Sequence, residues 1–185
     1  MGRPKGFSRE EVLLKAISVF WEQGFAQTTV QDLERATGVN KSGLYTEFKN
    51  KEDIFIESLR YYLDTRGGED ILSAEPKGWG NIERFLEIGQ TCYNGIRGCF
   101  SVNSMRDVAM LPSEAQELIA RSTARQKKLI VSNIKAVSSA SNPGALADMI
   151  LTFFSGLCIE ENLHPSNSSA ARRVDSLMTF LRQSK

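Results

Sequence analysis

Residues 28–51 read TTVQDLERATGVNKSGLYTEFKNK, and this stretch decides how the rest of the chain is interpreted. Two short segments with an apolar pattern, Val30–Thr37 and Lys41–Phe48, flank a turn that contains Gly38. Glycine suits such a turn because it readily adopts the left-handed conformation that ends many helices. The pattern predicts two short helices joined by a tight turn. This is the helix-turn-helix arrangement, in which the second helix enters the major groove of DNA.

Basic and hydroxyl side chains gather on and around the second of these segments. Lysines reach phosphates or guanine edges, and hydroxyls bond to phosphate oxygens. The small residues Ser42 and Gly43 suit a helix that lies close against a duplex, and a helix N-terminus with threonines favours an anion. A basic arm before the first helix suits the minor groove. The predicted DNA-contacting residues are Arg3, Lys5, Thr28, Thr29, Lys41, Ser42, Gly43, Tyr45, Thr46, Lys49 and Lys51.

Helical periodicity extends along the rest of the chain. Ser8 is a predicted N-cap for an amphipathic helix that ends at Gly24, and a further helix is expected over 51–66. Gly67-Gly68 and the run from Ser73 to Gly80 interrupt the pattern, after which apolar stripes recur to the C-terminal end. No alternating run that would indicate a strand is visible. The sequence predicts an all-α protein of about nine helices.

Composition excludes several classes of protein. The 185 residues carry 23 Lys+Arg against 22 Asp+Glu, so any DNA-binding charge must be local. Cys92, Cys99 and Cys158 form no CxxC pair, and the single His164 leaves no zinc framework. We expect no metal, no cofactor and a reducing, cytoplasmic location. The N-terminal residues do not resemble a signal peptide, and the uninterrupted apolar runs fall short of a membrane span.

Residues 8–55 resemble the DNA-binding domain of the TetR/AcrR family of bacterial transcriptional regulators. The matching residues are Phe20, Gly24-Phe25, Thr28-Thr29-Val30, Leu33, Ala36-Thr37-Gly38-Val39, Lys41–Phe48 and Asn50–Asp53, in the order and spacing of the family. The Gly98-Cys99-Phe100 helix start is similar as well. The resemblance implies a homodimeric DNA-binding repressor that a small molecule releases from a palindromic operator. It implies that the protein is not an enzyme.

The resemblance also suggests how the chain is divided. We expect a three-helix DNA-binding domain over 1–50 and an effector-binding and dimerisation domain over 51–185, joined by the helix 51–66. Apolar candidates for the effector pocket are Phe85, Tyr93, Phe100, Met105, Met110, Phe153 and Phe154. Helices with broad apolar faces predict a dimer interface that involves Met149, Phe153, Leu157, Val174, Leu177, Met178 and Leu181.

Alternative interpretations start from other residues. Cys99 follows Gly98 at an expected helix start, where the helix dipole would favour a redox-sensing thiolate in a regulator of the same fold. Glu160 and His164 are spaced to share a metal, but no third ligand is in view. A small helical enzyme would need a converging acid–base set, and the sequence shows none. A helical interaction module without DNA binding is the remaining alternative.

Overall fold

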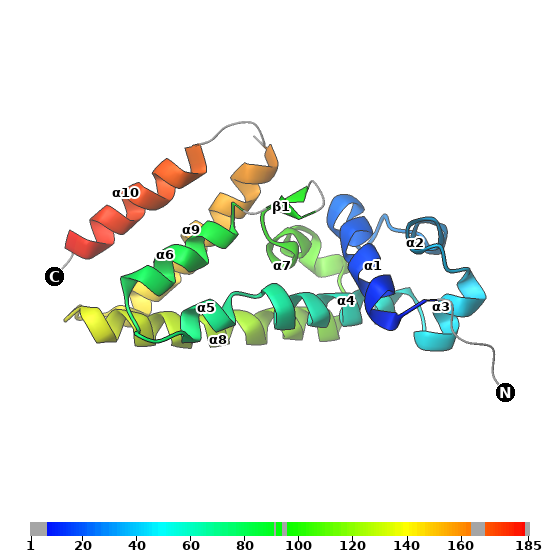
Figure 1. Cartoon of the computed structure of the whole chain (residues 1–185), viewed down its shortest axis with the longest axis horizontal. Coiled ribbons are helices and arrows are strands. Elements are labelled where there is room, and N and C mark those ends of the chain that lie inside the picture. Colours follow the sequence, from blue (N-terminus) through cyan, green and yellow to red (C-terminus); the bar gives the residue numbers. More distant parts are fainter. Residues whose placement is uncertain (1–6, 91, 94–95, 164–168, 184–185) are drawn as a thin grey trace.

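The computed structural model describes residues 7–90, 92–93, 96–163 and 169–183. Within these ranges the chain is almost wholly helical (Figure 1). The helices are α1 (Arg9–Gln23), α2 (Val30–Thr37), α3 (Lys41–Glu47), α4 (Lys51–Arg66), α5 (Glu69–Ser73), α6 (Trp79–Ile88), α7 (Phe100–Ser104), the 3₁₀ helix η1 (Met105–Met110), α8 (Ser113–Val137), α9 (Pro143–Leu163) and α10 (Ser169–Gln183). The predicted all-α class is confirmed.

Two short elements have no counterpart in the sequence pattern. They are α5 and a hairpin in which β1 (Cys92–Tyr93) pairs antiparallel with β2 (Ile96–Arg97). A helix of five residues completes little more than one turn, because a turn takes about 3.6 residues. An element this short cannot display a repeating apolar stripe.

The molecule is elongated, with α1–α3 at one end and α10 at the other (Figure 1). Helix α4 joins the two ends, since it packs on α1 and on α8. Phe100 of α7 is fully buried at this junction, and its ring centroid lies 5.8 Å from that of Trp21, 5.8 Å from that of Phe55 and 5.6 Å from that of Tyr62. One aromatic core therefore connects the N-terminal helices with the C-terminal ones.

The C-terminal helices are held together by a buried amide. Asn133 of α8 is completely buried, and its Oδ1 accepts from the Gly78 amide and from Asn81 Nδ2, both at 2.9 Å. Its Nδ2 donates to the carbonyl oxygens of Leu72 at 2.8 Å and Leu129 at 2.9 Å. Every polar atom of this side chain is satisfied, as burial requires. Asn133 thus fixes the α5–α6 connection against α8.

Helix α9 is apolar over most of its length. The segment Pro143–Asn162 has a mean hydropathy of 1.3, which by length and composition alone is enough to cross a membrane. This differs from the sequence expectation because an averaged hydropathy tolerates isolated polar residues such as Asp148 and Thr152. The helix packs along α8, and Asp148 makes a 2.6 Å ion pair with Lys127 there. Much of α9 nevertheless remains uncovered within one chain.

Candidate nucleic-acid interface

The α2–turn–α3 unit is built from local caps. Thr29 is the N-cap of α2, with its Oγ1 accepting from the Asp32 amide at 3.2 Å. Gly38 ends α2 at φ 74°, a left-handed conformation that a glycine adopts without strain. Asn40 then caps α3 by accepting from the Gly43 amide at 2.8 Å. The two predicted helices and their turn are therefore confirmed, residue for residue in α2.

Two side chains from outside α3 hold this helix in place, and a third, Lys15, holds the end of α2. Glu34 accepts a hydrogen bond from the Lys41 amide, which fixes the start of α3 against α2. Arg9 of α1 donates to the Glu47 carbonyl oxygen at 2.8 Å, and its guanidinium lies 4.4 Å from the centroid of the Phe48 ring. Lys15 of α1 donates to the carbonyl oxygen of Thr37 at 3.3 Å. Sequence reasoning does not single out these positioning residues, because their partners come from other helices.

The outer face of α3 carries the predicted contact residues Lys41, Ser42, Tyr45 and Thr46, all exposed. Lys41 Nζ lies 5.7 Å from the centroid of the Tyr45 ring, and Thr46 Oγ1 donates to the Ser42 carbonyl oxygen at 2.9 Å. The face therefore presents a cation and three hydroxyls to solvent. These are the groups that bind phosphates and base edges.

Lys49 continues this exposed surface beyond the end of α3. Its side chain is exposed and makes no ion pair with another described residue. Arg3 and Lys5, the predicted minor-groove arm, lie outside the described residues.

Thr28 and Lys51 do not join this surface, contrary to the sequence prediction. Thr28 is 1% exposed, and its hydroxyl donates to the Gly24 carbonyl oxygen at 2.7 Å. Lys51 Nζ donates to the carbonyl oxygens of Phe25 and Thr28, both at 2.9 Å, and lies 4.5 Å from the centroid of the Phe25 ring. Both residues tie the α1–α2 connection to the start of α4, where unsatisfied carbonyls need donors.

Gly43 has an internal reason to be small. A Cβ at this position would lie 2.8 Å from Val39 Cγ1 and 3.6 Å from the ring of Phe7. The first turn of α3 therefore packs directly on the turn that precedes it. The sequence predicts that Gly43 allows a close approach to DNA, whereas in the structure Gly43 lies close to Val39 and Phe7 of the protein itself. This contact sets the position of α3.

The predicted anion site at the start of α2 is already occupied by a carboxylate of the chain. Asp32 Oδ2 accepts from the Thr29 hydroxyl at 2.6 Å and from the Thr29 amide at 2.8 Å. These bonds hold the pKa of the Asp32 carboxyl below its ordinary value. Arg35 pairs with the same carboxylate at 2.6 Å. A DNA phosphate at this helix end would meet a negative charge that Arg35 partly neutralises.

The predicted effector residues are mostly core residues. Phe85 and Phe100 are fully buried, and the Phe85 ring stacks on Phe154 at 4.6 Å between centroids. Met110 is 62% exposed on η1, at the surface of the molecule. Apolar side chains between packed helices usually form the core. Whether a cavity remains beside them depends on how the helices pack, which the sequence pattern does not show. The side chain of Tyr93 lies outside the described residues.

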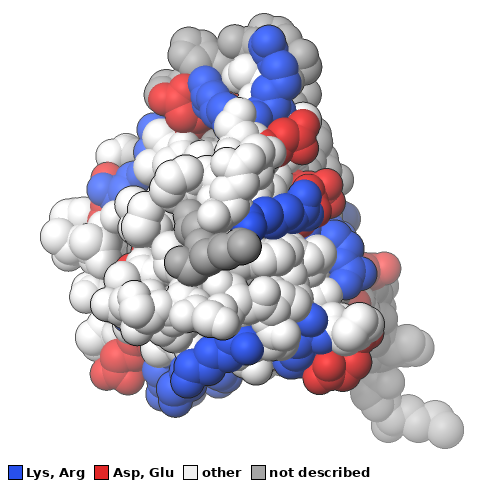
Figure 2. Space-filling view, turned by 90° about the vertical axis from the view of Figure 1, so that its left-hand side faces the viewer, with Lys and Arg blue, Asp and Glu red and all other residues white. Residues whose placement is uncertain are grey.

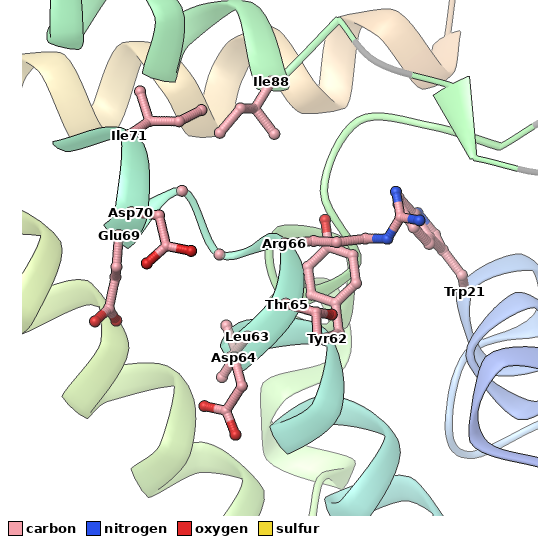
Figure 3. A pocket seen from close by; sticks show the side chains of 12 residues that line it. Trp21, Tyr62, Leu63, Asp64, Thr65, Arg66, Glu69, Asp70, Ile71 and Ile88 are labelled. Atoms are coloured by element: carbon pink, nitrogen blue, oxygen red, sulfur yellow. The ribbon is translucent and has the colours of Figure 1, made fainter. Parts of the chain in front are cut away.

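Two predicted residues do line a hollow. Met105 and Phe154 border a crevice of about 290 Å³ between α7, η1, α8 and α9, and Phe153 is half-buried on α9. A second hollow, of about 310 Å³, is lined by residues that sequence reasoning missed. We call it the junction cavity; its walls are Trp21, Tyr62–Ile71 and Ile88 (Figure 3). It adjoins both the end of α1 and the end of α4.

Cys99 and Glu160 are the described residues of the alternative site predictions, and their surroundings differ from those predictions. Cys99 precedes α7, as the helix-start prediction requires, but it is buried, and its sulfur lies 3.5 Å from Ser101 Oγ. Burial raises the pKa of the Cys158 thiol far above its ordinary value. Glu160 pairs with Arg173 at 3.4 Å, and His164 lies outside the described residues. Among the described residues, no three His, Cys, Asp or Glu side chains gather in a way that could hold a metal ion.

The predicted dimer residues divide into two groups. Leu157, Val174, Met178 and Leu181 are at most 3% exposed within one chain. Helix α10 buries Val174, Met178 and Leu181 and packs on α6, where Arg182 pairs with Glu83 at 2.6 Å, which corrects the prediction that these three residues face a second copy. Met149 is 52% exposed, and Phe153 and Leu177 are half-buried.

The end of the molecule that carries α10 is shown in Figure 2. Uncharged residues occupy much of the centre of this face, and Lys and Arg side chains lie toward its edges. Large apolar side chains are exposed on the three C-terminal helices: Val137 of α8, Met149 of α9 and Phe180 of α10. Monomeric proteins seldom expose such side chains in a contiguous patch without a partner.

Comparison with known proteins gives an independent view of the fold and of the α2–α3 unit. Residues 12–57 match the family model described as bacterial regulatory proteins, tetR family. The chain is 46% identical over 63 residues to the transcriptional repressor ComR of Escherichia coli (strain K12), covering 34% of this chain and 30% of ComR. It is 31% identical over 134 residues to the transcriptional regulator YezE of Bacillus subtilis (strain 168), covering 69% of this chain and 66% of YezE.

Solved structures extend the likeness over the whole fold. The TetR-family regulator CifR, solved as a cysteine mutant with a 26-base-pair operator DNA, superposes with a TM-score of 0.81. The superposition covers 96% of this chain and 98% of CifR at 21% identity. The match of residues 12–57 places the helix-turn-helix unit in a class of bacterial regulatory proteins, and the superposition shows that the whole fold is shared. The chain belongs to the TetR family of bacterial regulatory proteins.

Proposed function

We propose that the protein is a homodimeric transcriptional repressor that binds a palindromic DNA operator through α3 and is released from it by a small molecule. The observation that carries the proposal is the outer face of α3, where Lys41, Ser42, Tyr45 and Thr46 are exposed. Glu34 and Arg9 hold this helix from behind. A rigidly held, exposed helix with these groups is suited to a major groove.

A second copy of the chain supports the two-fold part of the proposal. The uncovered length of α9, with Met149 exposed and Phe153 half-buried, would pack against the same face of its partner in a helical bundle. Covering an apolar helix in this way explains its hydropathy without a membrane and fits a cytoplasmic protein. Two copies of α3 would then enter major grooves about 34–36 Å apart and read two halves of a palindrome.

Release by a small molecule follows from the way the two ends are joined. We divide the chain, as expected from the sequence, into a DNA-binding domain over 1–50 and an effector and dimer domain over 51–185. Helix α4 packs on both, and its last turn lines the junction cavity. A ligand that binds one setting of α4 more tightly than another would change the separation of the two α3 helices.

The oxidant-sensing alternative through Cys99 has less support. Reactive cysteines are partly exposed thiolates. Cys99 is 7% exposed, and its neighbour Cys158 is fully buried with its pKa raised by that burial. A ligand-operated repressor therefore remains the function that the site supports best.

A mobility-shift titration with DNA that flanks the protein's own gene tests the proposal. Lys41→Ala should weaken binding about tenfold and reduce the slope of log K against log salt by about one. Tyr45→Phe should weaken binding with little change in sequence preference, because a phosphate contact carries no base information. Lys128→Ala, at an exposed position of α8, is the matched control and should bind like the parent protein. Parent-like binding by both α3 variants would show that α3 is not the reading helix.

A further inference from the structure

The junction cavity has more negative than positive charge at its edge. Asp64 of α4 and Asp70 of α5 are exposed carboxylates, and neither makes an ion pair with another described residue. Glu69 also lines the cavity, but Arg125 pairs with it at 3.0 Å. The one cation in the lining, Arg66, extends toward Trp21 (Figure 3). The lining therefore keeps two carboxylates, those of Asp64 and Asp70, that no described cation neutralises.

Aromatic and aliphatic side chains form the remaining wall. Trp21 of α1 packs edge-on against Tyr62 of α4, with 5.5 Å between ring centroids and an interplanar angle of 82°. Ile71 and Ile88 line an adjacent side of the cavity (Figure 3). Burial raises the pKa of the Tyr62 hydroxyl well above its ordinary value, so this ring adds no charge at neutral pH. Aromatic rings attract cations through their negative faces.

We propose that the junction cavity binds a lipophilic organic cation, with the apolar part against Trp21, Tyr62 and Ile88 and the positive charge beside Asp64 and Asp70. The cavity volume of about 310 Å³ lies at the lower end of the range for small-molecule sites. An organic anion would face the same two carboxylates and be repelled. Charge and wall chemistry therefore select the same class of ligand.

The regulatory consequence rests on the proposed repressor function. The cavity wall combines the end of α1, which belongs to the DNA-binding domain, with α4, α5 and α6. At the α4–α5 turn, a Cβ on Gly68 would lie 2.7 Å from Ile88 and 2.8 Å from Phe85, so the turn is pressed against α6. Trp21 of α1 packs on Tyr62 of α4, and Ile88 of α6 packs on the turn that follows α4. A ligand between Trp21 and Ile88 would therefore push α1 and α6 apart at the end of α4. We expect occupancy to move α4 and to weaken operator binding.

The binding test uses tryptophan fluorescence. The chain has two tryptophans, and Trp79 lies on α6 outside the cavity lining, so Trp79→Phe leaves Trp21 as the reporter. Tetraphenylphosphonium and tetraphenylborate have nearly the same shape and opposite charges, and both are titrated into this protein. The double variant Asp64→Asn/Asp70→Asn removes the carboxylates without changing shape. Asp175→Asn, on an exposed position of α10, is the matched control.

We expect saturable quenching by the phosphonium, and at least tenfold weaker binding of it to the double variant, with Asp175→Asn unchanged. Tetraphenylborate should bind more weakly than the phosphonium and gain affinity in the double variant. Equal binding of both ions, or an unchanged phosphonium affinity in the double variant, overturns the proposed site. A denaturant titration of each variant establishes that it is folded.

Operator release is measured separately. A mobility shift without ligand tests the repressor function, and its failure leaves the fluorescence result standing. If operator binds and the phosphonium saturates the cavity without releasing DNA, the regulatory part of the inference is wrong. Release that needs at least tenfold more phosphonium in the double variant supports it.

Discussion

The α2–α3 unit and the α5–α8 region are held together in different ways. In the first, side-chain caps join residues three positions apart, as between Thr29 and Asp32 or between Asn40 and Gly43. In the second, Asn133 bonds to groups 52 to 61 positions away in the chain. Local bonds leave a signature in the sequence, whereas the partners of Asn133 are visible only once the helices are packed. The comparison predicts where substitutions cost most stability.

The largest effect is expected at Asn133. Asn133→Leu leaves the Gly78 amide, the Asn81 side chain and the Leu72 carbonyl without their buried partner. Each unsatisfied group costs roughly 1–3 kcal/mol, so we expect a loss of about 3 kcal/mol or more in the free energy of unfolding. Urea titration followed by circular dichroism measures the loss. Ser132→Ala, at the exposed neighbouring position, is the control; a loss below about 1 kcal/mol for Asn133→Leu would contradict the role of this amide.

Two glycines with the same backbone conformation separate local strain from packing. Gly38 and Gly68 have φ of 74° and 75°, but a Cβ on Gly38 meets nothing within 4 Å. Gly38→Ala should cost about 1 kcal/mol, the strain of a left-handed alanine. Gly68→Ala should cost about 2 kcal/mol more, because its Cβ meets Phe85 and Ile88. Equal losses of unfolding free energy for the two variants would show that α6 moves to accommodate the added methyl group, and that packing against α6 adds no cost.

A smaller loss is expected at the start of α2. Thr29→Ala removes the acceptor of the Asp32 amide, which typically costs about 1 kcal/mol of unfolding free energy. Thr29→Ser keeps the hydroxyl and should keep nearly all of the stability. The same urea titration compares the two. Equal destabilisation by serine and alanine would mean that the Thr29 methyl group, not the cap, stabilises this end of the helix.

The smallest effect concerns pH and the same cap. The pKa of Asp32 is lower in the folded protein than its ordinary value of 3.8, chiefly because of its bonds to Thr29. The ionised carboxyl therefore stabilises the fold above that ordinary value, and the stabilisation is lost as pH falls through the lowered folded pKa. Asp32→Asn should reduce stability at neutral pH, and the gap to the parent protein should close below about pH 4. A gap that stays constant on acidification would rule out this linkage.

The sequence alone places α3 because the signals that define this helix are local. Caps, the turn glycine and the apolar spacing of Leu33 and Leu44 all act within one or two helical turns. The same reasoning places Thr28 and Lys51 on the exposed surface around α3. In the structure Thr28 is buried, and the Lys51 ammonium group is bonded inside the protein. Both bond to carbonyls of the α1–α2 connection, and for Lys51 the nearer of these lies 23 positions away. The sequence does not show whether a lysine side chain will bind a DNA phosphate or a carbonyl oxygen of the protein itself.

What the sequence determined by itself is the helical class, the helix-turn-helix unit and the identity of the residues on the outer face of α3. The tertiary structure decided which apolar side chains fill the core, as Phe85 and Met178 do, and where a hollow remains beside Trp21. It also decided that Arg9 and Glu34 position α3. The physical reason is range: a cap or a helical stripe is set by neighbours along the chain, whereas a cavity is the space left after distant helices have packed.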